Sequence, residues 1–238
     1  MKLFQPRAPG VKFLCASNDW DVIPKPYPAR QYTPDWFKAL PMKLGDQGLN
    51  TSTIKRCNPF MDAMGLGWII PLAADVTFVS NEDGSGVDYR WTYDKVMVEN
   101  HTMEQVSSPK KPNPAMPRPP MKFMNYWLAV PDDGFSLLFM PPLNRPDPRF
   151  TLYSGLVDSD RYTEFVNFPF FLTPGFTGTI EAGTPLAQVV PIRRSDLGKK
   201  ADVGRIVEWP GTAGKLETTR RRRLSHESLY RDTLRVKK

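Results

Sequence analysis

Two carboxylates, Asp158 and Asp160, close the extended run that begins at Gly155 and lie two residues apart. Carboxylates at a strand end can hold a polar ligand, and they also accept hydrogen bonds from turn amides. Asp75, which follows an apolar run, offers the same choice, and for Asp75 we favour a bond to turn amides. For Asp158 and Asp160 both interpretations stay open.

His101 is one of two histidines and is followed by Glu104 and Gln105, so it invites a metal-site interpretation. A metal-dependent oxygenase is the function that such a site would support. The facial triad of non-haem iron enzymes needs a carboxylate two residues after the histidine, and Met103 stands there instead. We therefore expect no metal site, and His101 and Glu104 are the candidates to test against that expectation.

The positive charge of the chain is concentrated at its C-terminal end. The formal net charge is +7, and residues 215–238 hold nine Lys and Arg against three acids, which leaves residues 1–214 nearly neutral. Such a tail attracts polyanions, so nucleic acid is the expected partner, with an acidic protein surface or solubility alone as the alternatives. The candidate nucleic-acid-binding residues are Arg220, Arg221, Arg222, Arg223, Lys237 and Lys238.

The aspartates lie in a segment, 155–193, that alternates short β-rich runs with turns marked by glycine and proline. Its run from Phe168 to Phe171 is dense in aromatic rings, and we expect Phe168 and Phe170 to be buried. With 25 prolines the chain cannot form long helices or uninterrupted ladders. The sequence predicts one mostly-β domain over 1–214, a barrel or a sandwich, followed by a basic extension over 215–238 that can be helical.

Further strands are predicted upstream of this segment. An extended run at 11–15 opens the chain, 68–72 and 75–79 are predicted to form a buried strand pair, and 89–93 to return after a hairpin turn at 81–86. A stretch rich in proline and aromatic residues, 24–37, leads into one predicted helical turn at 34–41. This arm either covers the core of the domain, which we favour, or binds a partner.

A second proline-rich segment, residues 109–120, carries six prolines with Lys110, Lys111 and Arg118. It is typical of a polyproline-type linker or exposed loop, and a recognition peptide is the alternative. Cys15 and Cys57 lack metal-ligand spacing, so we expect buried free thiols in a reducing cytosol. No apolar run is long enough to cross a membrane, so we expect no membrane partner and no secretion.

Several motifs together resemble a family of uncharacterised proteins encoded by tailed bacteriophages and some bacteria. The resemblance covers most of the chain and implies a location in the host cytoplasm or in the virion. It is carried by Pro34-Asp-Trp-Phe-Lys38, Lys55-Arg-Cys-Asn-Pro-Phe60, Trp127 with Gly134-Phe-Ser136, 139–144, 155–160 and 183–193.

Residues 155–193 also resemble the third and fourth motifs of trimeric dUTPases and the related dCTP deaminases. That resemblance implies a dUTPase-like core, with a jelly roll as the alternative, in a protein that can form homo-oligomers. It makes Asp158 the base that activates water, Tyr162 the ring beneath the deoxyribose, and Gln188 a group near the base. Asp160, Arg145 and Arg161 would complete the ligand site, with Mg²⁺ if a nucleotide is bound.

Two features of dUTPases are missing. The Arg-Ser-Gly motif that holds phosphates has no counterpart, because Asn144-Arg145-Pro146 stands in a similar place without a serine. The glycine-rich C-terminal arm is replaced by the arginine tail. We therefore predict a phage-type accessory protein whose β core binds a small polar ligand such as a nucleotide, without deciding whether it is an enzyme. A non-enzymatic virion or nucleic-acid-associated protein and a metal-dependent oxygenase are the alternatives.

Overall fold

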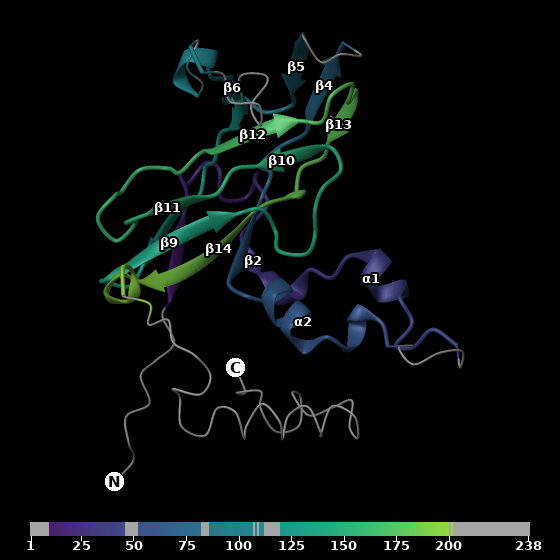
Figure 1. Cartoon of the computed structure of the whole chain (residues 1–238). Coiled ribbons are helices and arrows are strands. Elements are labelled where there is room, and N and C mark those ends of the chain that lie inside the picture. Colours follow the sequence, from purple (N-terminus) through teal and green to yellow (C-terminus); the bar gives the residue numbers. More distant parts are fainter. Residues whose placement is uncertain are drawn as a thin grey trace. The chain divides into compact units, whose positions relative to one another are not determined.

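The computed structural model describes residues 10–45, 52–81, 86–106, 108, 110–111, 120–199 and 201 (Figure 1). The chain divides into two compact units. The first comprises Met1–Leu40 with Asp62–Arg194, and the second Pro41–Met61 with Ser195–Lys238. The predicted basic extension, 215–238, lies outside the described residues, as do 82–85 in the predicted hairpin turn and most of the second proline-rich segment.

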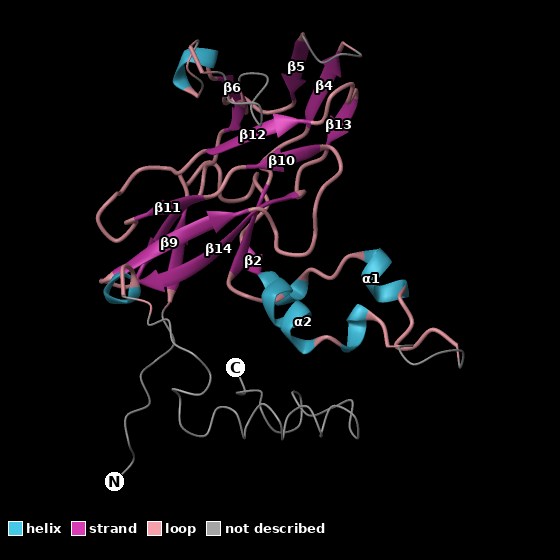
Figure 2. Ribbon diagram, viewed as in Figure 1, coloured by secondary structure: helices cyan, strands magenta, loops and turns pink. Residues whose placement is uncertain are grey.

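Strands dominate the first unit, which confirms the mostly-β prediction (Figure 2). Four antiparallel sheets are formed, in the orders β1-β8, β10-β12-β7-β6, β11-β9-β14-β3-β2 and β13-β4-β5. The strands are β1 (Val11–Leu14), β2 (Tyr27–Pro28), β3 (Trp68–Pro71), β4 (Val76–Ser80), β5 (Val87–Trp91), β6 (Val98–Asn100), β7 (Met121–Phe123), β8 (Leu128–Pro131), β9 (Phe135–Met140), β10 (Phe150–Leu152), β11 (Gly155–Val157), β12 (Phe168–Leu172), β13 (Gly178–Ile180) and β14 (Pro185–Arg193).

The described strands do not close into a barrel. The largest sheet ends at β11 on one side and at β2 on the other, and each of these strands pairs with a single neighbour. β2 is only two residues long, and Pro28 lacks the N–H that a further ladder would need. The sheets therefore remain open, and the barrel alternative is wrong for the described part of the chain.

Helices are short. They are η1 (Ala29–Gln31), α1 (Asp35–Ala39), η2 (Ile54–Arg56), α2 (Asn58–Met64), η3 (Met103–Gln105) and η4 (Arg194–Asp196). The single turn predicted at 34–41 is α1, where Phe37 is buried while the neighbouring Trp36 remains 49% exposed. One ring of this helix is therefore buried, although Phe37 is not part of the main core cluster, and the other ring stays at the surface. Among the described helices none is long and apolar enough to span a membrane.

The segment 155–193 folds as predicted, into β11, β12, β13 and β14. β14 lies inside the largest sheet, between β3 and β9, and Figure 1 shows it alongside β9. Phe168 and Phe170 of β12 are buried, as expected. The Phe170 ring stacks on Phe123 with centroids 3.8 Å apart, and Phe78 meets both rings edge-on.

Two local expectations need correction. The runs at 68–72 and 75–79 form β3 and β4, but these strands do not pair with each other, because β3 joins β14 and β2 whereas β4 joins β5 and β13. β5 does return along β4 as predicted. The cysteines are free, but only Cys15 is partly buried and Cys57 is exposed.

Gly67, just before β3, is required by its backbone. Its φ is +68°, and a Cβ there would lie 2.0 Å from the carbonyl oxygen of Val189 in β14. Only glycine allows β14 to approach so closely.

Candidate functional site

The two predicted carboxylates have different environments. Asp160 forms an ion pair with Arg194. Its side chain is 4% exposed, and Arg194 donates to its two oxygens over 2.6 and 2.5 Å. The backbone N–H of Gly134 donates to it as well, over 2.9 Å. The hydrogen bond from Arg194 is the main reason that the pKa of Asp160 lies well below its usual range. Asp160 therefore holds the end of β14 to the turn before β9.

Asp158, in contrast, is 59% exposed and keeps free acceptor capacity. The hydroxyl of Ser136, a fully buried residue of β9, donates to one oxygen of Asp158 over 2.5 Å. The Arg194 guanidinium approaches that same oxygen no closer than 3.7 Å. The carboxylate is thus oriented by a buried hydroxyl but still open to a ligand.

Arg161 and Tyr162 lie on the same turn as Asp158. The backbone N–H groups of both donate to the Asp158 carbonyl over 2.9 Å, which fixes a compact turn after β11. Both side chains are exposed, and Tyr162 is 48% exposed. Four predicted site residues therefore share this turn: the accessible Asp158, the ion-paired Asp160, the cation Arg161 and the ring of Tyr162.

Arg145 and Gln188, also predicted to bind the ligand, lie together elsewhere and serve the chain itself. Arg145 is 5% exposed and donates over 2.7–3.1 Å to the carbonyls of Ala29, Tyr32 and Met64 and to Gln188. Gln188, fully buried in β14, donates to the carbonyls of residues 63 and 66 and accepts from the N–H of Leu143. Burial lowers the pKa of Arg145. The pair fastens the C-terminal end of α2, and the chain at η1, to β14.

The side chain of His101 is engaged in a local turn. Its Nδ1 lies 3.2 Å from Oε1 of Gln105, which also accepts from the backbone N–H of Thr102 and caps η3. Glu104 stands beside them in η3. Within the described ranges, no three His, Cys, Asp or Glu side chains gather as metal ligands would.

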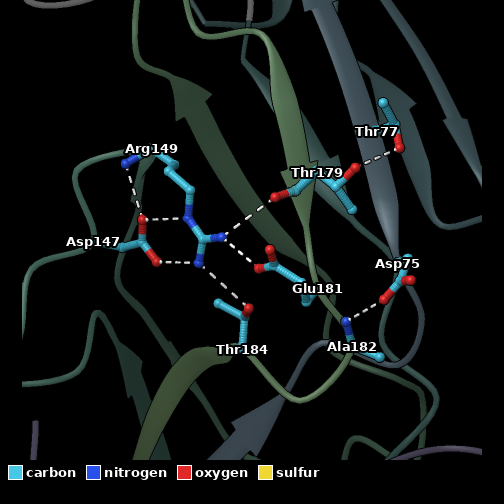
Figure 3. Close-up of polar contacts among 8 residues, drawn as sticks. All are labelled: Asp75, Thr77, Asp147, Arg149, Thr179, Glu181, Ala182 and Thr184. Atoms are coloured by element: carbon cyan, nitrogen blue, oxygen red, sulfur yellow. Dashed lines mark hydrogen bonds and ion pairs between the residues drawn. The ribbon is translucent and has the colours of Figure 1, made fainter.

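Arg149 organises a network that sequence reasoning missed (Figure 3). It forms a two-pronged ion pair with Asp147, over 3.0 and 2.8 Å, and a third bond of 2.7 Å to Glu181. These contacts tie the loop before β10 to the turn between β13 and β14. The only sequence signal was the proximity of Asp147 and Arg149. Figure 3 also shows Asp75 accepting from the N–H of Ala182 over 2.7 Å, as expected for a turn-capping carboxylate.

Two cavities adjoin this network. The larger, of about 160 Å³, is lined by Tyr32, Pro34, Trp36, Arg145, Pro146, Asp147, Pro148 and Pro185. The smaller, of about 80 Å³, shares Arg145, Pro146, Asp147 and Pro185 and adds residues 141–142, 150–152 and 186. Aromatic and proline rings line most of the larger cavity. In the sequence these rings stand in the proline-rich and aromatic arm, 24–37, and in the prolines around Arg145.

The candidate nucleic-acid-binding residues of the tail, 220–223 and 237–238, lie outside the described residues. Comparisons with protein-family models, with curated proteins and with solved structures find no match to this chain.

Proposed function

We propose that the chain is a phage-type accessory protein whose β core binds a small polar ligand, a nucleotide in our proposal, at the turn after β11. The observation that carries this proposal is the division of labour between the two aspartates. Asp160 is neutralised by Arg194, whereas Asp158 is accessible and held in place by Ser136. A turn with a purely structural role would need only the ion-paired carboxylate, that of Asp160.

The chemistry of the turn suits a nucleotide. Arg161 is exposed and can pair with a phosphate, although its charge also contributes to the lowered pKa of Asp160. The exposed ring of Tyr162 can pack on a sugar or base. If hydrolysis occurs, Asp158 is the group that can accept a proton from water. In this proposal the core is related to dUTPases or to jelly rolls, and the protein acts in the host cytoplasm or in the virion.

Mg²⁺ would accompany a nucleotide at this turn. Asp158 offers an accessible carboxylate, which fits Mg²⁺ held by one carboxylate, phosphate oxygens and water. Mg²⁺ would supply charge neutralisation for the phosphates.

Titration calorimetry with deoxynucleoside triphosphates, with and without Mg²⁺, tests the proposal. The wild type should bind, and Asp158→Asn should remove binding and any turnover while leaving the melting temperature nearly unchanged. Asp133→Asn, which removes an exposed carboxylate close to Arg194, is the matched control and should behave like the wild type. Absence of nucleotide binding by the wild type, or equal binding by Asp158→Asn, would refute the proposal.

A second candidate function rests on the positive charge of the C-terminal tail. The tail holds +6 of the net +7, so a virion or nucleic-acid-associated role through 220–223 and 237–238 is proposed alongside the first. The oxygenase alternative rests on His101 and Glu104 alone, and metal analysis of the purified protein decides it.

A further inference from the structure

β5 ends the three-stranded sheet, because it pairs with β4 along its whole length and with no other described strand (Figure 1). Among the described strands that end a sheet it is the longest, and it contains neither proline nor glycine. An unpaired strand edge offers a row of N–H and C=O groups to another strand. β5 is therefore the edge of the described fold best suited to accept one.

The hydrogen bonds between β4 and β5 show which backbone groups of β5 face the free edge. The N–H of Asn81 donates to the carbonyl of Gly86 over 2.9 Å, and a bond in the same phase, from the N–H of Thr92, closes the other end of the pair. In an antiparallel ladder every second residue bonds to the partner strand, so Asp88 and Arg90 bond to β4. The residues whose N–H and C=O groups point to the free edge are Val87, Tyr89 and Trp91.

The side chains of β5 are sorted by face. Its odd-numbered residues are partly buried and pack against the core, whereas Asp88 and Arg90 are exposed. Their neighbours across β4 are Val79 and Thr77, which are uncharged. Neither Asp88 nor Arg90 forms an ion pair within the part of the chain that the structure describes. The solvent face of this edge therefore carries one acid and one base that can pair with charges on an added strand.

These two charges stand symmetrically about Tyr89. When β5 of a second copy runs antiparallel with the two Tyr89 residues opposite each other, Asp88 of each copy lies opposite Arg90 of the other. Val87 then lies opposite Trp91, and the backbone groups of the free edge form the hydrogen-bonded pairs. Asp88 and Arg90 form the other kind of pair, in which the Cα atoms are only about 4.5 Å apart. Opposite charges placed directly across two strands stabilise the pairing.

We propose that β5 is a dimerisation edge, which pairs with β5 of a second copy of this chain about a two-fold axis at Tyr89. The neighbouring registers that keep the hydrogen bonds in phase place Arg90 opposite Arg90 or Asp88 opposite Asp88, so charge selects the symmetric register. Each copy uses the same strand, so the contact closes as a dimer. Two short edges bury little area, so we expect a Kd on the order of 10–100 µM. The inference is independent of the nucleotide proposal, because β5 contains none of the residues of the turn after β11.

Sedimentation of the full-length protein across this concentration range tests the proposal. The wild type should show reversible association of monomers into dimers. Asp88→Arg and Arg90→Asp each bring like charges together twice in every dimer, so each should weaken association by about tenfold or more. Asp21→Arg is the matched control, because Asp21 is also an exposed acid but lies outside the strands, and it should associate like the wild type.

Exchanging the charges tests the register itself. In an equimolar mixture of Asp88→Arg and Arg90→Asp, the basic edge of one variant faces the acidic edge of the other, so a heterodimer should form although neither variant associates with itself. The double variant Asp88→Arg/Arg90→Asp should again form a homodimer. Melting temperatures check that each variant is folded. A monomeric wild type, a mixture that does not associate, or association of Asp88→Arg equal to that of the wild type would overturn the proposal.

Discussion

Arg194 bonds Asp160 over 2.5 Å but stays 3.7 Å from Asp158, although the two aspartates share one turn. Thirty-four residues separate Arg194 from Asp160, so the contact depends on β14 running beside β9. The same geometry leaves the carboxylate of Asp158 to Ser136 and to solvent. One residue of the pair is therefore structural, and the other is available for a ligand.

The ion pair of Asp160 predicts how stability depends on pH. Because its pKa is lowered in the folded state, its contribution is fully present above the unfolded pKa of about 3.9 and is lost as pH falls through the folded pKa. Asp160→Asn should lower the melting temperature by several degrees at pH 7. The difference from the wild type should shrink below about pH 4. Thermal melts of both proteins across pH 2–7 measure it, and a constant difference would contradict the assignment.

Phe170 should be among the most costly core positions. Its ring is fully buried against Phe123, Phe78 and Phe150, so Phe170→Ala should destabilise by about 3–5 kcal/mol. Phe165→Ala serves for comparison, because Phe165 is 43% exposed and should cost about 1 kcal/mol or less. Denaturant unfolding measures both. A small loss at Phe170 would mean that the ring stack is absent.

Replacing Arg145 by lysine should destabilise the protein, although the positive charge is retained. A single ammonium group cannot reach the four acceptors that the guanidinium serves, and the carbonyls left unpaired are buried. We expect a loss of about 2–4 kcal/mol in urea unfolding. Arg161→Lys, at an exposed turn, should stay within about 0.5 kcal/mol of the wild type.

Alanine substitutions at Gly67 and Gly183 distinguish the cost of a steric clash from the cost of backbone strain. Both have positive φ, but a Cβ at Gly183 meets nothing within 4 Å, whereas at Gly67 it would collide with β14. Gly183→Ala should cost about 1–2 kcal/mol from strain alone, and Gly67→Ala clearly more. Equal losses in denaturant unfolding would show that β14 can move away from Gly67.

The tail predicts salt-dependent binding to duplex DNA. With about four to six phosphates contacted, the logarithm of affinity should fall with the logarithm of salt concentration at a slope near −4 to −5. Replacing Arg220, Arg221, Arg222 and Arg223 by alanine should reduce the slope to about −1. Fluorescence anisotropy at several salt concentrations measures it. Binding that ignores salt, or that survives the replacement, would place the interaction elsewhere.

Local physics determined much of this protein from sequence. Alternating β-rich runs and turn residues predicted the strands of 155–193, the ring density at Phe168 and Phe170 predicted burial, and Asp75 after an apolar run predicted a turn cap. Each of these signals lies within a few neighbouring residues. Composition also predicted short elements, because prolines interrupt ladders wherever they fall.

Only the tertiary structure decided which polar groups remain available. Arg145 and Gln188 have the composition of a ligand site, but the carbonyls around α2 consume their hydrogen bonds. Asp158 and Asp160 are the same residue type. They differ because Arg194, 34 residues after Asp160, forms its hydrogen bonds with Asp160. Strand pairing is equally non-local, since β3 and β4 are adjacent in sequence yet belong to different sheets. Hydrogen-bond partners brought together by folding, rather than residue type, determine which side chains can meet a ligand.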